Sequence, residues 1–170
     1  MSEPFAVLNQ LSTEDAREAL SRCCGAQRWV EGMLTQRPFS SNDALYQSAD
    51  EVWRGLHQSD YLEAFSHHPQ IGADMETLRQ KFRATARWSS EEQASVGEAD
   101  EQTLLSLRAD NALYLQRFGF IFIVCATGKS AASMLQLLRE RLGHTANEEL
   151  HIAAGEQAKI THLRLRKLTF

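Results

Sequence analysis

One short segment of the chain, Phe120-Ile121-Phe122-Ile123-Val124-Cys125, combines aromatic and β-branched residues in the way that is typical of a buried strand. A strand needs a neighbour, because each of its backbone N–H and C=O groups requires a hydrogen-bond partner. The sequence holds no second run of this kind. The rest of the chain is therefore expected to be helical, and the amides of this segment need partners outside a sheet, for which a bound ligand is one candidate.

Apolar residues repeat at helical spacing through most of the remaining chain, as at Leu45, Ala49, Val52 and Leu56. These segments indicate about eight helices, and the longest is expected over about 100–118. We expect helices to begin at Ser12 or Thr13, Asn42, Ser59, Ser130 and Asn147, and others to end at Gly25, His67, Gly119 and Gly143. The chain shows no repeat and no linker, so the sequence predicts a single all-α domain over residues 1–170.

Composition excludes several classes of protein. The chain has 170 residues, 43% hydrophobic and 24% charged, with a net charge of −4. An acidic balance argues against nucleic-acid binding, which relies on a basic surface. The longest apolar run, 118–126, is about half the length of a membrane span, and the N-terminus has no signal-peptide pattern. Three cysteines form no disulfide framework, so we expect a soluble cytoplasmic protein with buried thiols and no membrane partner.

The strongest candidate for chemistry is His68, which lies between a predicted helix end and Pro69. About twenty residues later, Ser89 and Glu92 have the spacing of a capping box, followed by Gln93. An imidazole and a carboxylate fixed near each other are the usual material of proton-transfer chemistry. Either residue could instead be structural, so the residues leave two functions open: an acid/base enzyme and a non-catalytic helical interaction module.

Two other patterns carry less weight. Gly128-Lys129-Ser130 resembles the end of a phosphate-binding loop, but the position that requires glycine is Ile123, and the segment more simply turns the chain and caps the next helix. His57, His67 and His68 lack the spacing of a metal site. We therefore expect no metal and no cofactor, and a metal-dependent hydrolase stays as a weaker alternative.

Five motifs occur in order along the chain: His68-Pro69-x-Ile71-Gly72, Ser89-x-x-Glu92-Gln93, Asn111-x-x-Tyr114-x-x-x-Phe118-Gly119-Phe120, Arg141-Leu142 and Lys159-Ile160-x-x-x-Arg164-Leu165. In combination they resemble the OHCU decarboxylase family (2-oxo-4-hydroxy-4-carboxy-5-ureidoimidazoline decarboxylase), nearly from end to end. The resemblance implies an all-helical, homodimeric, cofactor-free carboxy-lyase. Its small-molecule substrate would be OHCU, converted to (S)-allantoin and CO2 in the final step of urate degradation.

The resemblance also implies roles for individual residues. His68 and Glu92 match the catalytic histidine and glutamate of the family. Positions that match substrate contacts are Pro69, Ser89, Glu92, Gln93, Phe120, Ile121, Phe122, Ile123, Val124 and Arg164, with backbone amides acting in the 120–124 segment. One departure is Gln70, where many members have arginine. On this basis we expect a protonated His68 to polarise the substrate and then to deliver a proton to one face, while Glu92 holds the substrate hydroxyl or orients the imidazole.

Overall fold

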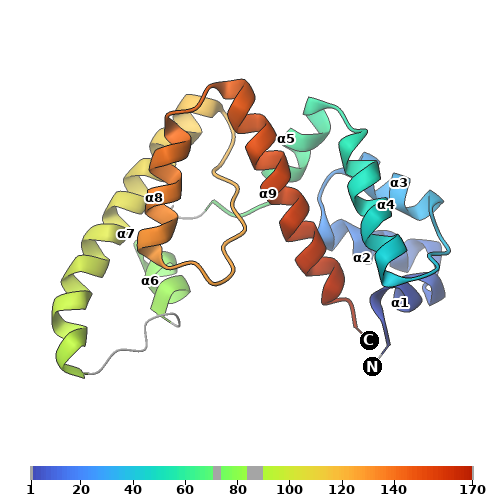
Figure 1. The fold of residues 1–170 in the computed structure, drawn as a ribbon, viewed down its shortest axis with the longest axis horizontal. Helices are drawn as coiled ribbons and strands as arrows, with labels where there is room; N and C mark the ends of the chain where they lie inside the picture. Colours follow the sequence, from blue (N-terminus) through green and yellow to red (C-terminus); the bar gives the residue numbers. More distant parts are fainter. Residues whose placement is uncertain (1, 71–73, 84–89, 170) are drawn as a thin grey trace. The chain divides into compact units, whose positions relative to one another are not determined.

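A computed structural model of the chain describes residues 2–70, 74–83 and 90–169, and at 83 and 90–100 it describes the backbone alone. These described residues form nine helices and no strand (Figure 1), which confirms the all-α prediction with one helix more than expected. The helices are α1 (Pro4–Gln10), α2 (Thr13–Cys23), α3 (Gln27–Thr35), α4 (Asn42–Arg54), α5 (Gln58–Ser66), α6 (Met75–Arg83), α7 (Ser90–Phe118), α8 (Ala131–Leu142) and α9 (Ala146–Arg166).

The helices belong to two compact units. The first unit consists of Met1–His68, Ile123–Cys125 and Ala154–Phe170, and so contains α1 to α5 and the later turns of α9. The second unit consists of Pro69–Phe122 and Ala126–Ala153, and contains α6, α7, α8 and the first turns of α9. Whether residues 1–170 form a single domain stays a prediction.

The first unit is held by an aromatic and aliphatic core whose polar atoms are satisfied. The indole of Trp29 is fully buried and donates from Nε1 to the Ala49 carbonyl at 3.1 Å. The Trp53 indole donates to the Ala154 carbonyl at 3.0 Å, which attaches α4 to α9. Other fully buried side chains are Leu8, Leu20, Met33, Leu45, Phe65 and Leu165. Burying each large apolar side chain contributes about 1.5–3 kcal/mol, so these contacts fix the helices that carry the site.

The second unit is built on α7 and α8, which lie side by side (Figure 1) and pack through Leu104, Leu107, Met134 and Leu138. The predicted long helix is present, but it begins at Ser90, about ten residues earlier than expected. Its first turns carry few apolar residues, so periodicity could not reveal them. It ends as predicted at Gly119, whose φ of 79° is the left-handed conformation that glycine adopts readily.

A buried charge network lies inside the second unit. The carboxylate of Glu149 is fully buried and accepts hydrogen bonds from the Arg141 guanidinium and from the Tyr114 hydroxyl, the latter at 2.5 Å. The His144 Nδ1 lies 3.1 Å from the second carboxylate oxygen. The guanidinium carbon of Arg141 lies 4.4 Å from the centre of the Phe122 ring. Removal of one charged partner from such a network should therefore destabilise the unit strongly.

Two predicted helix starts are confirmed by their caps. The Ser12 hydroxyl accepts a hydrogen bond from the Asp15 amide at 3.1 Å, and Ser130 accepts one from the Ser133 amide at 3.1 Å. The end of α8 at Gly143 is also as predicted, whereas α2 is capped by Cys24, one residue before Gly25.

Three predicted helix starts are wrong by one to two residues. Helix α4 is capped by Ser41, whose hydroxyl accepts from the Ala44 amide at 3.0 Å, and not by Asn42. Helix α9 is capped by Thr145, which accepts from the Glu148 amide at 3.2 Å, and not by Asn147. Helix α5 follows an N-cap at His57, before Ser59. At α4 the extended backbone of Ser41 lets its side chain turn back to the amide three residues later, which Asn42, as the first residue of the helix, cannot do.

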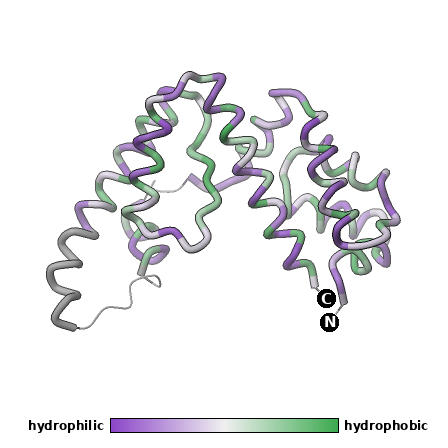
Figure 2. The backbone as a smooth tube through the Cα atoms, in the orientation of Figure 1, coloured by the Kyte–Doolittle hydropathy of each residue, from purple (hydrophilic) through white to green (hydrophobic). Residues whose placement is uncertain are grey.

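The segment 120–125, which is strongly hydrophobic (Figure 2), forms neither a helix nor a strand. Its Cys125 amide donates to the Glu156 carboxylate at 3.2 Å, within the first unit. Ile123 and Val124 are buried. The predicted need for non-sheet partners is therefore met at Cys125 by a side chain of α9. Among the described helices none combines the length and the apolar composition needed to cross a bilayer.

Candidate functional site

His68 lies immediately after α5, where the prediction placed it. His67 is the C-cap of α5, and the His68 amide closes the last turn by donating to the Phe65 carbonyl at 3.1 Å. The His68 side chain is half-buried, and its Nε2 lies 2.5 Å from Oε1 of Gln157 on α9. The His68 backbone is therefore fixed by the end of α5, and its imidazole by the buried Gln157 amide of α9.

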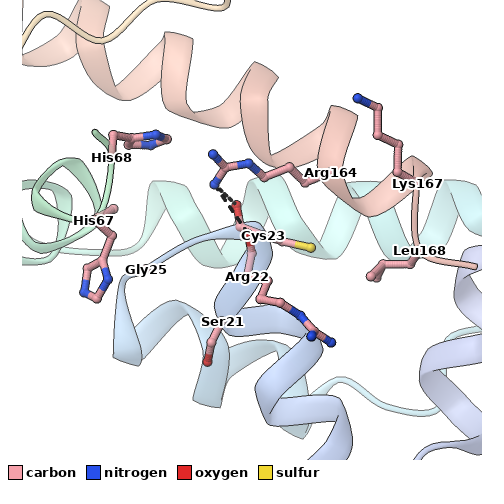
Figure 3. A pocket seen from close by; sticks show the side chains of 10 residues that line it. Ser21, Arg22, Cys23, Gly25, His67, His68, Arg164, Lys167 and Leu168 are labelled. Carbon is pink, nitrogen blue, oxygen red and sulfur yellow. Dashed lines mark hydrogen bonds between the residues drawn. The ribbon is translucent and has the colours of Figure 1, made fainter. Parts of the chain in front are cut away.

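His68 lines a cleft of about 500 Å³ within the first unit (Figure 3). The lining residues are Ser21, Arg22, Cys23, Gly25, Ala64, His67, His68, Arg164, Lys167 and Leu168. Three of them are permanent cations, and none of these described lining residues is acidic. A cleft of this composition favours an anionic occupant.

Among the cations of the cleft, Arg164 faces His68: Figure 3 shows its guanidinium and the imidazole turned toward each other. Its Nη1 donates to the carbonyls of Arg22 and Cys23, each at 3.4 Å, at the C-terminal end of α2. The helix dipole places partial negative charge there, which stabilises the guanidinium. Arg166 lies elsewhere, with its guanidinium carbon 5.5 Å from the centre of the Tyr46 ring. Arg164, and not Arg166, therefore shares the cleft with His68.

The environment lowers the pKa of His68 below its ordinary value. Burial is the main cause, because it penalises the charged imidazolium, and the positive charges of Arg164 and His67 act in the same direction. The hydrogen bond with Gln157 partly opposes this effect. The imidazole is consequently neutral at pH 7 before any ligand binds.

The two adjacent thiols beside the cleft are unreactive. Burial raises the pKa of Cys23 to about 12 and that of Cys24 to about 11. Both thiols therefore stay protonated near neutral pH and pack as small apolar groups, as predicted. Cys125 is only half-buried.

Gly25 makes room for the histidine pair. A Cβ at position 25 would lie 2.5 Å from Cγ and 2.7 Å from Cβ of His67. These atoms are at the base of the side chain, so a rotamer change cannot remove the clash, and the backbone next to His68 would have to move. We expect Gly25→Ala to lower the free energy of unfolding by about 1–3 kcal/mol, measured by urea denaturation.

The matched control for that substitution is Gly155→Ala. A Cβ there would meet no atom within 4 Å, and the site is an exposed position within α9. Alanine is favoured over glycine inside a helix by about 0.8–1.0 kcal/mol, so this variant should be more stable than the parent protein. Equal effects of the two substitutions would contradict the steric explanation.

The structure brings together two of the predicted site residues, His68 and Arg164, in one cleft. Pro69 and Phe120–Phe122 belong to the second unit, and Ile123 and Val124 to the first. Glu92 and Gln93 lie in the first turns of α7, where only the backbone is described, and Ser89 lies outside the described residues. The roles of these residues stay predictions.

Sequence reasoning missed Gln157 and Thr161, which lie on the buried face of α9. The Gln157 amide donates from Nε2 to the Thr161 Oγ1 at 3.0 Å. The available signal was the helical spacing of Ala154, Gln157, Thr161 and Leu165, which places two polar residues on one buried stripe.

Comparison with known proteins gives a consistent result. The family model for OHCU decarboxylase matches residues 9–166. The chain is 30% identical over 168 residues to the 2-oxo-4-hydroxy-4-carboxy-5-ureidoimidazoline decarboxylase of Halalkalicoccus jeotgali, covering 95% of this chain and 89% of that protein. It is 40% identical over 147 residues to the uric acid degradation bifunctional protein TTL of Arabidopsis thaliana, covering 86% of this chain. The match spans only 45% of the length of the Arabidopsis protein.

A solved structure has the same fold. A crystal structure of OHCU decarboxylase in the presence of (S)-allantoin superposes with a TM-score of 0.71 at 35% sequence identity. The superposition covers 92% of this chain and 97% of that chain. The similarity therefore extends over nearly the full length of both proteins.

Proposed function

The chain belongs to the OHCU decarboxylase family and is a decarboxylase of urate degradation, and from this premise we propose how it acts on its substrate. The proposed reaction is the cofactor-independent conversion of OHCU to (S)-allantoin and CO2. The observation that carries the proposal is that His68 and Arg164 line one cationic cleft. The substrate is a carboxylate anion at neutral pH, and such a cleft attracts it and places a proton carrier beside it.

The chemistry follows from the structure of the substrate. Its C4 carries the hydroxyl and the carboxylate, so the ring double bond of the imidazoline joins C5 to a ring nitrogen. Breakage of the bond between C4 and the carboxylate releases CO2 and leaves an electron pair at C4, which spreads into that double bond. Nearby cations and N–H donors stabilise the developing negative charge. Arg164 is the cation in the cleft that we assign to this task.

Each turnover consumes one proton overall. The C4 hydroxyl gives up its proton and becomes the carbonyl of allantoin, the ring nitrogen gains a proton, and the new C–H bond forms at C5, the carbon that carries the ureido group. We assign delivery of the C5 proton to His68. The imidazole is neutral before the substrate binds, because burial lowers its pKa. The arriving carboxylate favours protonation of the imidazole, which takes a proton from water and then, as the imidazolium, transfers it to C5 from one side. Delivery from one side explains a single enantiomer of allantoin.

The remaining parts of the proposal come from the family. Glu92 is assigned to the substrate hydroxyl, and Pro69, Ser89, Gln93 and the 120–124 segment to substrate contacts. We further propose that the protein is a cytoplasmic homodimer with a single domain. Size-exclusion chromatography with light scattering tests the dimer, since a monomer at micromolar concentration would contradict it.

The function is tested with freshly generated substrate. Urate is converted by an oxidase and a hydroxyisourate hydrolase in the cuvette, this protein is added, and circular dichroism follows the allantoin formed. We expect rapid appearance of one enantiomer. Slow formation of racemic allantoin at the rate of the blank would reject the proposal and would favour the alternative, a non-catalytic helical interaction module. Full activity after treatment with a chelator would dismiss the metal-dependent hydrolase.

The pH dependence of kcat/KM tests the role of His68. The reaction requires a protonated imidazole, and the pKa of His68 in the free protein lies below its ordinary value of 6.5. The reactive protonation state therefore becomes rarer as pH rises. We expect kcat/KM to fall by about tenfold per pH unit above pH ~6.5, after subtraction of the spontaneous rate. An increase in kcat/KM between pH 6 and 8 would contradict this assignment.

A further inference from the structure

Gln157 occupies an unusual position for an amide. It is fully buried on α9, and its Oε1 lies 2.5 Å from Nε2 of His68. A buried amide is tolerated when its polar atoms are satisfied, and here the imidazole satisfies the carbonyl side. Among the residues that the structure describes, Gln157 is the side chain hydrogen-bonded to the His68 ring, so this contact dominates the ring's orientation.

The orientation of the amide is fixed by the next turn of α9. The Nε2 of Gln157 donates to the Thr161 Oγ1 at 3.0 Å, and Thr161 is buried. The Thr161 oxygen acts as the acceptor in this contact, and only the nitrogen of the Gln157 amide can donate to it. The amide nitrogen therefore faces Thr161, and the carbonyl oxygen faces His68.

A carbonyl oxygen can only accept a hydrogen bond. His68 must then carry its proton on Nε2 in the neutral state, and Nδ1 is the nitrogen that gains and loses a proton. We propose that Gln157 is a positioning residue, oriented by Thr161, that fixes His68 in the Nε2–H tautomer and so reserves Nδ1 for proton transfer. The catalytic part of this inference rests on the proposed function, whereas the tautomer does not.

Nitrogen-15 NMR of histidine-labelled protein tests the tautomer without any substrate. Protonated and unprotonated ring nitrogens have widely separated shifts, and the His68 signals are assigned by their loss in His68→Asn. We expect the parent protein at pH 8 to show a protonated Nε2 and an unprotonated Nδ1. The reverse pattern in the parent protein would overturn the proposal, whatever the variants do.

Gln157→Glu supplies a second, isosteric test. A carboxylate at this position adds a negative charge beside the imidazole. The other ionisable groups of the cleft are Arg22 and the Cys23 thiol of α2, His67 at the end of α5, Arg164 of α9 and Lys167 just after α9. We expect the titration of His68, followed by NMR, to move to higher pH than in the parent protein. An unchanged titration would show that position 157 does not contact the ring.

The catalytic consequence is tested with a matched pair at position 161. Thr161→Ser keeps the hydroxyl that orients Gln157, and Thr161→Val replaces it with a methyl group of similar size. We expect Thr161→Val to reduce kcat by about tenfold with little change in KM, and Thr161→Ser to restore most of the activity. Gln157→Leu should reduce kcat by about 10- to 100-fold.

The outcomes separate the two proposals. If the parent protein shows the Nε2–H tautomer but no variant alters kcat, the positioning role in catalysis is rejected while the hydrogen-bond geometry stands. If the parent protein has no decarboxylase activity, the proposed function fails, and the NMR result still decides the tautomer. A loss of kcat that is equal in Thr161→Ser and Thr161→Val would indicate a packing effect and would overturn the inference.

Discussion

Replacement of His68 by asparagine is expected to lower kcat by about 10²- to 10⁴-fold, the range that a general acid typically contributes. This corresponds to about 3–5.5 kcal/mol of transition-state stabilisation. Asparagine cannot carry a proton near neutral pH, although its amide occupies part of the space of the imidazole. The allantoin that still forms should be racemic, because protonation of C5 would then come from water on either side. Circular dichroism of the product measures both effects in one experiment.

Two further histidine variants sharpen this experiment. His151→Asn changes an exposed residue of α9 and should leave kcat unchanged. His67→Asn removes the neighbouring imidazole, which lies beside Gly25 and, in contrast to His68, is exposed. If His67→Asn lost most of its kcat while His68→Asn kept the kcat of the parent protein, His67 and not His68 would be the proton carrier.

Glu149→Leu is expected to have the largest effect on stability. The substitution removes the carboxylate that the Arg141 guanidinium contacts, while the Arg141 side chain is only 6% exposed. Breaking a buried ion pair from one side costs about 3–5 kcal/mol, because the remaining charge stays in a poorly solvated place. For a chain of this size the melting temperature should fall by about 6–20 °C.

The control for that measurement is Glu140→Leu, the same substitution at an exposed position of α8. It should change the free energy of unfolding by less than about 0.5 kcal/mol. The double variant Arg141→Met/Glu149→Leu removes both charges and should regain much of the stability lost in Glu149→Leu. If the double variant were as unstable as the sum of its single variants, the ion pair would not be the cause.

Helices could be predicted where apolar spacing and capping residues agreed. Ser12 and Ser130 each precede a regular apolar stripe, and both are caps in the structure. Periodicity failed for the first turns of α7, where the side chains are mostly polar or small. Neighbouring cap candidates such as Ser41 and Asn42 have nearly equal intrinsic preference, so tertiary contacts decide between them: the Asn42 side chain accepts instead from the Phe5 amide at 3.2 Å.

The site was predictable only in part. His68 could be singled out because Pro69 ends the helix there, and Arg164 because it belongs to a motif. Gln157 could be found only through the helical spacing that it shares with Ala154 and Leu165, because a glutamine in a helix is usually exposed and the packing of the first unit buries this one. Packing likewise buries Glu149, whose buried partner Tyr114 is 35 residues away in sequence.

Gln157, Thr161 and Arg164 all come from successive turns of α9. Their relative directions are thus set by helical geometry, in which each residue adds a rotation of about 100°. Substitution of an exposed neighbour such as Lys159 leaves those directions intact. Deletion of a single residue between 157 and 164 would instead turn Arg164 away from the cleft by about 100° relative to Gln157. This wall of the cleft can therefore tolerate wide variation in residue type at its outer positions but almost none in length.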